Sequence, residues 1–244
     1  MADRKPSTTP KSRGRDVPPL KAVRTRAIRA PRPIDDQTLL EILTRFEEAD
    51  PNPRGELDYH DPYTLLVAVV LSAQATDKSV NLATRELFKA AGTPAQMVAL
   101  GEERLSECIR TIGLFRTKAR NVVALSRILL ETHGGVVPPT REVLETLPGV
   151  GRKTASVVMN VAFAQPTIAV DTHVFRVSHR IPIVIAKTPD DVQIGLEKRI
   201  PQRFVARAHH WLILHGRYTC KARTPDCPRC LISDLCRFPS KTIA

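Results

Sequence analysis

A helical repeat of apolar residues runs from Asp36 almost to the end of this 244-residue chain, and it constrains the fold more than any other feature. Apolar side chains recur every three or four residues, which places them on one face of an α-helix. Such segments span residues 39–46, 79–88, 104–112, 119–130, 140–147, 153–163 and 204–215. Only 67–71 and 181–185 resemble strands, and neither shows the alternation of a half-buried sheet. We therefore predict an all-α fold of about ten helices.

Several helix starts are marked by their own capping residues. A hydroxyl or carboxylate side chain is followed directly by proline at 61–62, 93–94 and 188–189. Gln96 stands at the third position after Thr93, and Asp191 holds the same position after Thr188. Both arrangements are typical of the first turn of a helix. We predict helices that begin at these three places.

Four cysteines lie close together near the C-terminus in a C-x6-C-x2-C-x5-C pattern: Cys220, Cys227, Cys230 and Cys236. In an intracellular protein such a group binds a metal more often than it forms disulfides. Structural zinc sites usually pair two short knuckles, whereas four thiolates also hold iron–sulfur clusters, so the spacing leaves both open. The fifth cysteine, Cys108, falls on an amphipathic segment, and we expect it to be a small core residue.

Positive charge is concentrated at the N-terminus. Residues 1–34 contain ten Lys or Arg against Asp3 and Asp16, a net charge of +8 out of +12 for the whole chain. Because this segment also has six prolines and little apolar surface, we predict a disordered basic arm. It would serve either as a solubilising tail or as an electrostatic tether to a polyanion. The prolines and the two acids argue against a transit peptide.

The chain shows no sign of a membrane or secretory segment. No apolar run approaches the roughly 20 residues of a membrane span, and there is no apolar signal region. We therefore expect no membrane partner and an intracellular location, in the cytoplasm or nucleoid if the source is bacterial. A chain of this length is also sufficient for a monomer with its own core.

Residues 147–155, LPGVGRKTA, place a lysine two positions after a Gly-x-Gly turn. A nucleotide-binding P-loop is excluded, because Thr146 stands where its first glycine belongs and the preceding segment is helical. What remains is helix, tight turn and helix, in which Gly149 and Gly151 permit positive φ or close backbone approach. Backbone N–H groups at such a helix start would bind a DNA phosphate without reading its sequence. The alternative is an ordinary turn of a helical hairpin.

These residues resemble a known family. LPGVGRKTA is similar to the helix–hairpin–helix of DNA-repair glycosylases, and AVDTHVFRV (169–177) followed by the four cysteines resembles the endonuclease III family. The resemblance covers about residues 36–240 and includes LSAQATD (71–77), TIGLFRTKA (111–119) and HHWLILHGRYTC (209–220).

The resemblance implies a fold of two helical domains with a DNA-binding cleft between them. A continuous six-helix domain, 55–165, would carry the helix–hairpin–helix. The second domain would combine 35–54 with 166–244 and would hold a [4Fe–4S] cluster on the four cysteines. The resemblance, and not the cysteine spacing, thus favours iron–sulfur over zinc.

The resemblance also implies an activity in base excision repair. The chain would be a bifunctional DNA glycosylase and abasic-site (AP) lyase that excises oxidised pyrimidines and cleaves 3′ to the abasic site by β-elimination. Lys153 would form the Schiff base, which requires a neutral amine. Its place in a first helical turn beside Arg152 disfavours the ammonium form. Asp171 matches the family's carboxylate across the cleft and would stabilise positive charge on the sugar. The simpler interpretations are a solvated lysine and a helix-capping aspartate.

Damaged double-stranded DNA is the partner that the resemblance implies. Chemistry on a base inside a duplex requires the nucleotide to be flipped out, and Gln74 and Leu114 match the residues that fill the gap. Their simpler interpretations are a polar helix end and a core leucine. Further DNA contacts are predicted at Gly149, Val150, Gly151, Arg152, His173, Lys221 and Arg223. His209 and His210 are expected to be core or capping residues.

Three positions depart from the family pattern. Arg116 replaces a small polar residue, and Thr224 and Asp226 stand where more positive charge is expected. Weaker phosphate contact at the cysteine segment, offset by the basic arm, is a hypothesis. It predicts that deleting residues 1–34 reduces the salt dependence of DNA binding.

Two other functions remain open from the sequence. A monofunctional glycosylase would keep the hairpin and the cysteines, but it would lack the lysine. A non-catalytic DNA-binding module would use Lys153 to hold a phosphate and the cysteines as a structural metal site, and it would bind DNA without cutting it.

Overall fold

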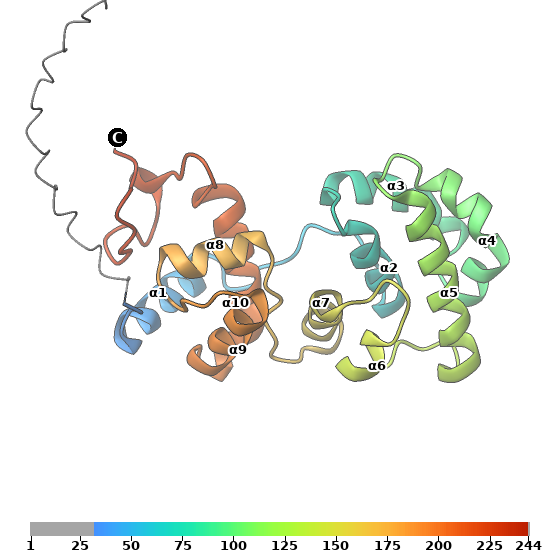
Figure 1. Cartoon of the computed structure of the whole chain (residues 1–244), viewed down its shortest axis with the longest axis horizontal. Coiled ribbons are helices and arrows are strands. Elements are labelled where there is room, and N and C mark those ends of the chain that lie inside the picture. Colours follow the sequence, from blue (N-terminus) through green and yellow to red (C-terminus); the bar gives the residue numbers. More distant parts are fainter. Residues whose placement is uncertain (1–31, 244) are drawn as a thin grey trace, which may run out of the picture. The chain divides into compact units, whose positions relative to one another are not determined.

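The computed structural model describes residues 32–243 and is built from α-helices (Figure 1). No strand occurs among these residues, so the all-α prediction is confirmed. The predicted basic arm lies almost wholly outside the described residues. The α-helices are α1 (Asp36–Ala49), α2 (Pro62–Ser72), α3 (Asp77–Ala90), α4 (Pro94–Cys108), α5 (Phe115–His133), α6 (Arg141–Glu145), α7 (Arg152–Phe163), α8 (Thr172–Arg180), α9 (Pro189–Arg199) and α10 (Gln202–Leu214). A π-helical turn, η1 (His215–Thr219), and a 3-10 turn, η2 (Cys227–Arg229), follow.

The helix starts predicted from capping residues are confirmed. The side chain of Asp61 accepts a hydrogen bond from the N–H of Thr64, and Thr93 forms a reciprocal capping box with Gln96. Thr188 accepts from the N–H of Asp191. Each cap satisfies an N–H group that the helix itself leaves unpaired.

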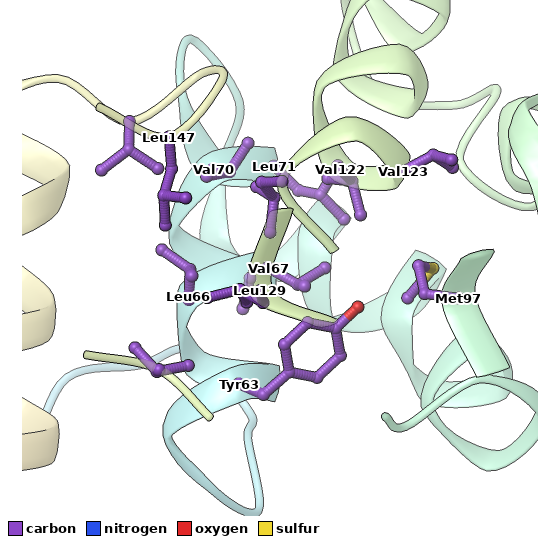
Figure 2. Close-up of a cluster of buried hydrophobic side chains, with 14 of the residues drawn as sticks. Tyr63, Leu66, Val67, Val70, Leu71, Met97, Val122, Val123, Leu129 and Leu147 are labelled. Atoms are coloured by element: carbon purple, nitrogen blue, oxygen red, sulfur yellow. The ribbon is translucent and has the colours of Figure 1, made fainter. Parts of the chain in front are cut away.

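A first hydrophobic core forms around α2, which is buried along nearly its whole length (Figure 2). This explains why α2 is apolar on every side, since it packs against α3, α5 and α7. Tyr63 and Ser126 share a buried hydrogen bond of 2.7 Å between their hydroxyl oxygens. Each fully buried aliphatic side chain here, such as Leu66, contributes about 1.5–3 kcal/mol relative to exposure.

A second hydrophobic core joins α1 to the C-terminal helices α8, α9 and α10. Phe46 of α1 stacks on Trp211 of α10, and the indole N–H of Trp211 donates to the carbonyl of Asp50 at 2.8 Å. The second core therefore combines α1 with helices that follow the first core in the sequence. The domain boundaries given above remain a prediction.

Buried polar side chains fix the connection from α7 to α8. The amide nitrogen of Asn160 donates to the carbonyls of Thr167 and Ala206, at 2.8 and 3.2 Å. The hydroxyl of Thr167 donates back to the carbonyl of Ser156 at 2.9 Å. Because these bonds are buried, losing a partner would leave an unsatisfied polar group. Thr167, in the segment between α7 and α8, is therefore held against α7 by two hydrogen bonds.

One side-chain prediction is wrong. Cys108 is exposed, because Leu105 and Ile109 form the buried stripe of this turn and Cys108 lies beside it. None of the described helices is long and apolar enough to span a bilayer.

Candidate functional site

The Gly-x-Gly turn connects α6 to α7. Gly149 has φ 79°, and a Cβ there would come within 2.9 Å of the Asn121 side chain, so both conformation and space require glycine. Gly151 precedes α7 as its N-cap with an extended backbone, and nothing lies within 4 Å of where its Cβ would be. Because no side chain caps α7, the N–H groups of its first turn have no side-chain acceptor. The turn is therefore open to an anion.

Val150 and Arg152, at this turn, differ in whether their polar groups already have partners in the protein. The side chain of Val150 is buried and its N–H donates to the carbonyl of Leu147 at 3.0 Å, so this N–H is already bonded. The Nε of Arg152 lies 3.9 Å from a carboxylate oxygen of Asp190, too far for a hydrogen bond. Its guanidinium therefore pairs only weakly with protein.

Lys153 and Asp171 line one pocket of about 1010 Å³. Lys153 lies in the first turn of α7, is exposed, and forms no ion pair with the described residues. Asp171 is half-buried directly before α8. The structure therefore brings together two side chains that are eighteen positions apart in the sequence.

Asp171 is a helix cap as well as a pocket residue. Its Oδ1 accepts hydrogen bonds from the N–H groups of His173 and Val174, both at 2.8 Å. Both bonds use the same oxygen, so the capping interaction fixes the carboxylate while Oδ2 is not used for it. Capping and chemistry are compatible at this residue.

Two histidines lie in the wall of the same pocket. His209 is 2% exposed, and burial, with smaller effects of neighbouring His210 and Lys153, lowers its pKa from 6.5 to about 3. Burial also lowers the pKa of His210. Both are therefore neutral at physiological pH and add no cation beside Lys153. The expectation that His209 is a core histidine is confirmed.

An ionic cluster in the pocket was missed by the sequence analysis. Arg217 of η1 donates to a carboxylate oxygen of Asp77 at 2.7 Å, and it also bonds Glu56. The hydroxyl of Tyr218 donates to Glu56, and this bond, followed by the charge of Arg217, lowers the pKa of that carboxyl. The partners are distant in the chain, and only the presence of Asp77, Arg217 and Tyr218 in the quoted stretches 71–77 and 209–220 hinted at a role.

The two residues predicted to fill a gap in DNA are both exposed and both left-handed. Gln74 has φ 55°, and Leu114 has φ 60° and is 63% exposed. An exposed leucine in a strained turn is not a core residue, so that simpler interpretation is wrong.

The four cysteines of the C-terminal segment line one small pocket with Ile181, Ile232 and Phe238. All four are free thiols. Burial raises the pKa of Cys230 to about 11 and also raises that of Cys236. In residues 32–243 their side chains do not form a group already close enough to hold a metal ion. A soft-metal donor set in an apolar wall nevertheless suits a metal that displaces the thiol protons.

Helix α8 connects the pocket to the cysteine segment. Arg180 donates to the carbonyls of Lys221 and Ala222, at 2.6 and 2.7 Å, and its guanidinium lies 3.5 Å from the sulfur of Cys220. Arg176 bonds His173 and the carbonyl of Cys220, both at 3.1 Å. This places Lys221 and Arg223 on an exposed loop.

Asp226, one of the departures from the family pattern, is not a free negative charge. Arg229 donates to its carboxylate at 2.8 Å, and this hydrogen bond lowers the pKa of Asp226. The carboxylate of Asp226 is therefore paired with Arg229.

Comparison with known proteins shows the class first. Residues 67–202 match the family model of HhH-GPD superfamily base excision DNA repair proteins. This range includes the turn, Lys153 and Asp171, and it extends through the connection between the two cores. The protein is an enzyme of the DNA glycosylase class.

Similar proteins identify the family within this class. Endonuclease III of Escherichia coli (strain K12) is 55% identical over 202 residues, which is 83% of this chain and 96% of the relative. That of Treponema pallidum is 52% identical over 203 residues, with the same coverages. A structure of a trapped endonuclease III–DNA covalent intermediate has TM-score 0.79 and 44% identity, covering 84% of this chain and 96% of that one. The chain belongs to the endonuclease III family.

Proposed function

We propose that this protein is a bifunctional DNA glycosylase and AP lyase that acts on oxidised pyrimidines in double-stranded DNA. The observation that carries the proposal is the shared pocket of Lys153 and Asp171, with an amine that forms no ion pair with a carboxylate in the described part of the chain. The covalent endonuclease III–DNA intermediate among the structural relatives supports the same chemistry. An intracellular location and a monomeric state belong to the proposal.

Lys153 supplies the nucleophile. Its neutral Nζ attacks C1′ of the flipped nucleotide, the bond from C1′ to the base breaks, and the base leaves with the bonding electrons and gains a proton. Loss of the amine proton and opening of the sugar ring leave an iminium on C1′. Removal of a C2′ proton then expels the 3′ phosphate as the C3′–O bond breaks.

Asp171 acts on charge and on protons. Its carboxylate, fixed by two N–H groups of α8, stabilises the positive charge that develops on the sugar. The oxygen not used in capping is available to accept the proton that the amine or C2′ loses.

The DNA contacts follow from which groups are exposed. The free N–H groups at the start of α7, with Gly149, Gly151 and Arg152, bind a phosphate, and Val150 contributes only its remaining backbone atoms. Gln74 and Leu114 fill the gap left by the flipped nucleotide. Lys221 and Arg223 of the cysteine segment, with His173 at the start of α8, contact the backbone nearer the second core.

The four cysteines would hold a [4Fe–4S] cluster, as the family resemblance implies and as their chemistry allows. When bound, the cluster supplies structural order to a segment that has little regular secondary structure. Arg180 beside Cys220 would offset part of the negative charge of the thiolates. The cluster takes no part in the steps above.

The experiment is borohydride trapping on duplex DNA with one abasic site. Wild type should form a covalent adduct and nick the strand, and Lys153→Ala should do neither while still binding. Lys198→Ala, on the exposed face of α9, is the matched control and should behave as wild type. A second duplex with one thymine glycol is assayed in parallel for release of the base. Wild type that binds but neither traps, nicks nor releases the base would leave the non-catalytic module as the function. Release of the base without trapping or nicking would indicate a monofunctional glycosylase.

A further inference from the structure

The two gap-filling residues share an unusual backbone. Gln74 and Leu114 are left-handed, and in residues 32–243 the only other non-glycine residue in this region is Ala164. A left-handed L-residue costs about 1–2 kcal/mol and persists only where the surrounding structure imposes it. The contacts that hold these two turns therefore decide where the gap-filling side chains lie.

Lys118 is bonded to the base of both turns. It lies in α5, where its backbone N–H donates to the carbonyl of Leu114 at 3.0 Å. Its side chain crosses to α2, and Nζ donates to the carbonyl of Leu71 at 2.9 Å. Leu71 lies three residues before Gln74, in the last turn of α2. One residue thus connects the two turns that carry Gln74 and Leu114.

The environment of Lys118 is costly for an amine. The residue is 5% exposed and forms no ion pair with any described residue, and burial lowers its pKa. A hydrocarbon side chain would fill the same space without the desolvation of an amine. The end of α2 lessens this cost, because its last carbonyls carry partial negative charge. The amine is therefore specifically suited to hold the end of α2, which a hydrocarbon would not do.

We propose that Lys118 is a positioning residue for nucleotide flipping, which holds the turn of Gln74 and the turn of Leu114 in a fixed relation so that both side chains enter the gap together. This inference rests on the proposed function and deepens it. A single strand has no opposing stack to fill, so it needs neither side chain. Losing the contact between Lys118 and Leu71 should therefore impair action on duplex DNA and spare chemistry on a single strand.

The test compares Lys118→Met with Lys198→Met, which removes the same charge from an exposed position on α9. The first assay is single-turnover excision from a duplex with one thymine glycol. The second is borohydride trapping on a single-stranded oligonucleotide with one abasic site. Lys118→Met should be slower in the first by roughly tenfold or more, and within about twofold of wild type in the second. Lys198→Met should match wild type in both.

A fluorescent base reports the positioning directly. With 2-aminopurine opposite the lesion, wild type should raise the fluorescence as the base is unstacked, and Lys118→Met should lose most of that rise. Adding Lys118→Met to the double variant Gln74→Ala/Leu114→Ala should not slow that variant further on duplex, because both gap-filling side chains are already lost. Losses that multiply, or an unchanged fluorescence rise, would overturn the proposal.

Failure of folding and failure of the parent proposal are separable. If Lys118→Met unfolds at the assay temperature, Lys118→Arg replaces it, since it keeps a cationic donor on a different head group. Equal losses on duplex and single strand for this variant would show an ordinary core contact and overturn the role of Lys118. Wild type that does not trap duplex DNA with one abasic site would instead overturn the proposed lyase.

Discussion

The core around α2 and the core around α10 differ in what their buried side chains can do. Around α2 the interior is almost entirely hydrocarbon, and among residues 32–243 Lys118 is the one buried side chain there that is able to carry a charge near neutral pH. Around α10 it includes the buried histidines His209 and His215, and the cysteine pocket lies next to it. The first core is held mainly by packing, whereas the second also contains groups that can take up a proton or bind a metal. Of the two pocket residues, Lys153 lies on α7, which packs in the first core, and Asp171 directly precedes α8, which packs in the second.

Loss of a cysteine should have the largest effect, and it should separate the behaviour of the two cores. Cys230→Ser should remove the visible absorbance of the cluster and melt the C-terminal segment and the core beside it, because metal binding there contributes to folding. The helices of the first core should keep their hydrogen-exchange protection. Hydrogen exchange resolved by peptide checks this, and loss of protection in α2 at the same time would show that the two cores are not separable. Cys108→Ser is the matched control, because Cys108 is exposed on α4.

Truncation of a buried side chain in the first core should also have a large effect, on the free energy of unfolding. Leu66 is fully buried, so Leu66→Ala should lower the free energy of unfolding by about 2–5 kcal/mol. The visible absorbance per folded molecule should not change. Leu82→Ala, at a position 66% exposed, is the control and should cost little. Denaturant titration measures both, and a loss of absorbance before unfolding in Leu66→Ala would contradict the comparison.

Acid should act mainly through the second core. His209 has a folded pKa of about 3 against an ordinary 6.5, so its contribution is present above pH 6.5 and is lost progressively as the pH falls toward 3. His210 and Lys153, the charges near it, act in the same direction. At pH 5 the loss is about 2 kcal/mol. His209→Gln should flatten the decline of thermal stability between pH 7 and 5. An equally steep decline would place the acid sensitivity elsewhere.

The smallest effect on stability is expected at Asp171. Asp171→Asn keeps an oxygen that can cap α8, so the free energy of unfolding should change by less than about 0.5 kcal/mol. Borohydride trapping should nevertheless fall sharply, because the neutral amide does not stabilise the developing positive charge. Thermal melting and trapping on the same preparation check the two parts. Asp171→Ala should lower both.

Much of the helix pattern was predictable because its signals are local. Asp61, Thr93 and Thr188 begin helices by bonding residues three positions away, and apolar spacing alone indicates which face is buried. Cys108 shows the limit of this reasoning. Leu105 and Ile109 of the same turn are the buried residues, and Cys108 beside them is exposed. The number of cysteines predicts a metal site, which stays a prediction, and their spacing does not distinguish zinc from an iron–sulfur cluster.

The sequence by itself determined the all-α class, the caps, the turn with its lysine and the cysteine segment, because each depends on residues close together in the chain. Only the tertiary structure decided that Arg217 meets Asp77 and Glu56 and that Lys118 reaches the end of α2. These contacts join residues 47 to about 160 positions apart. Such pairings depend on how the apolar faces of whole helices pack. The apolar periodicity of one helix does not indicate which other helix its apolar face contacts.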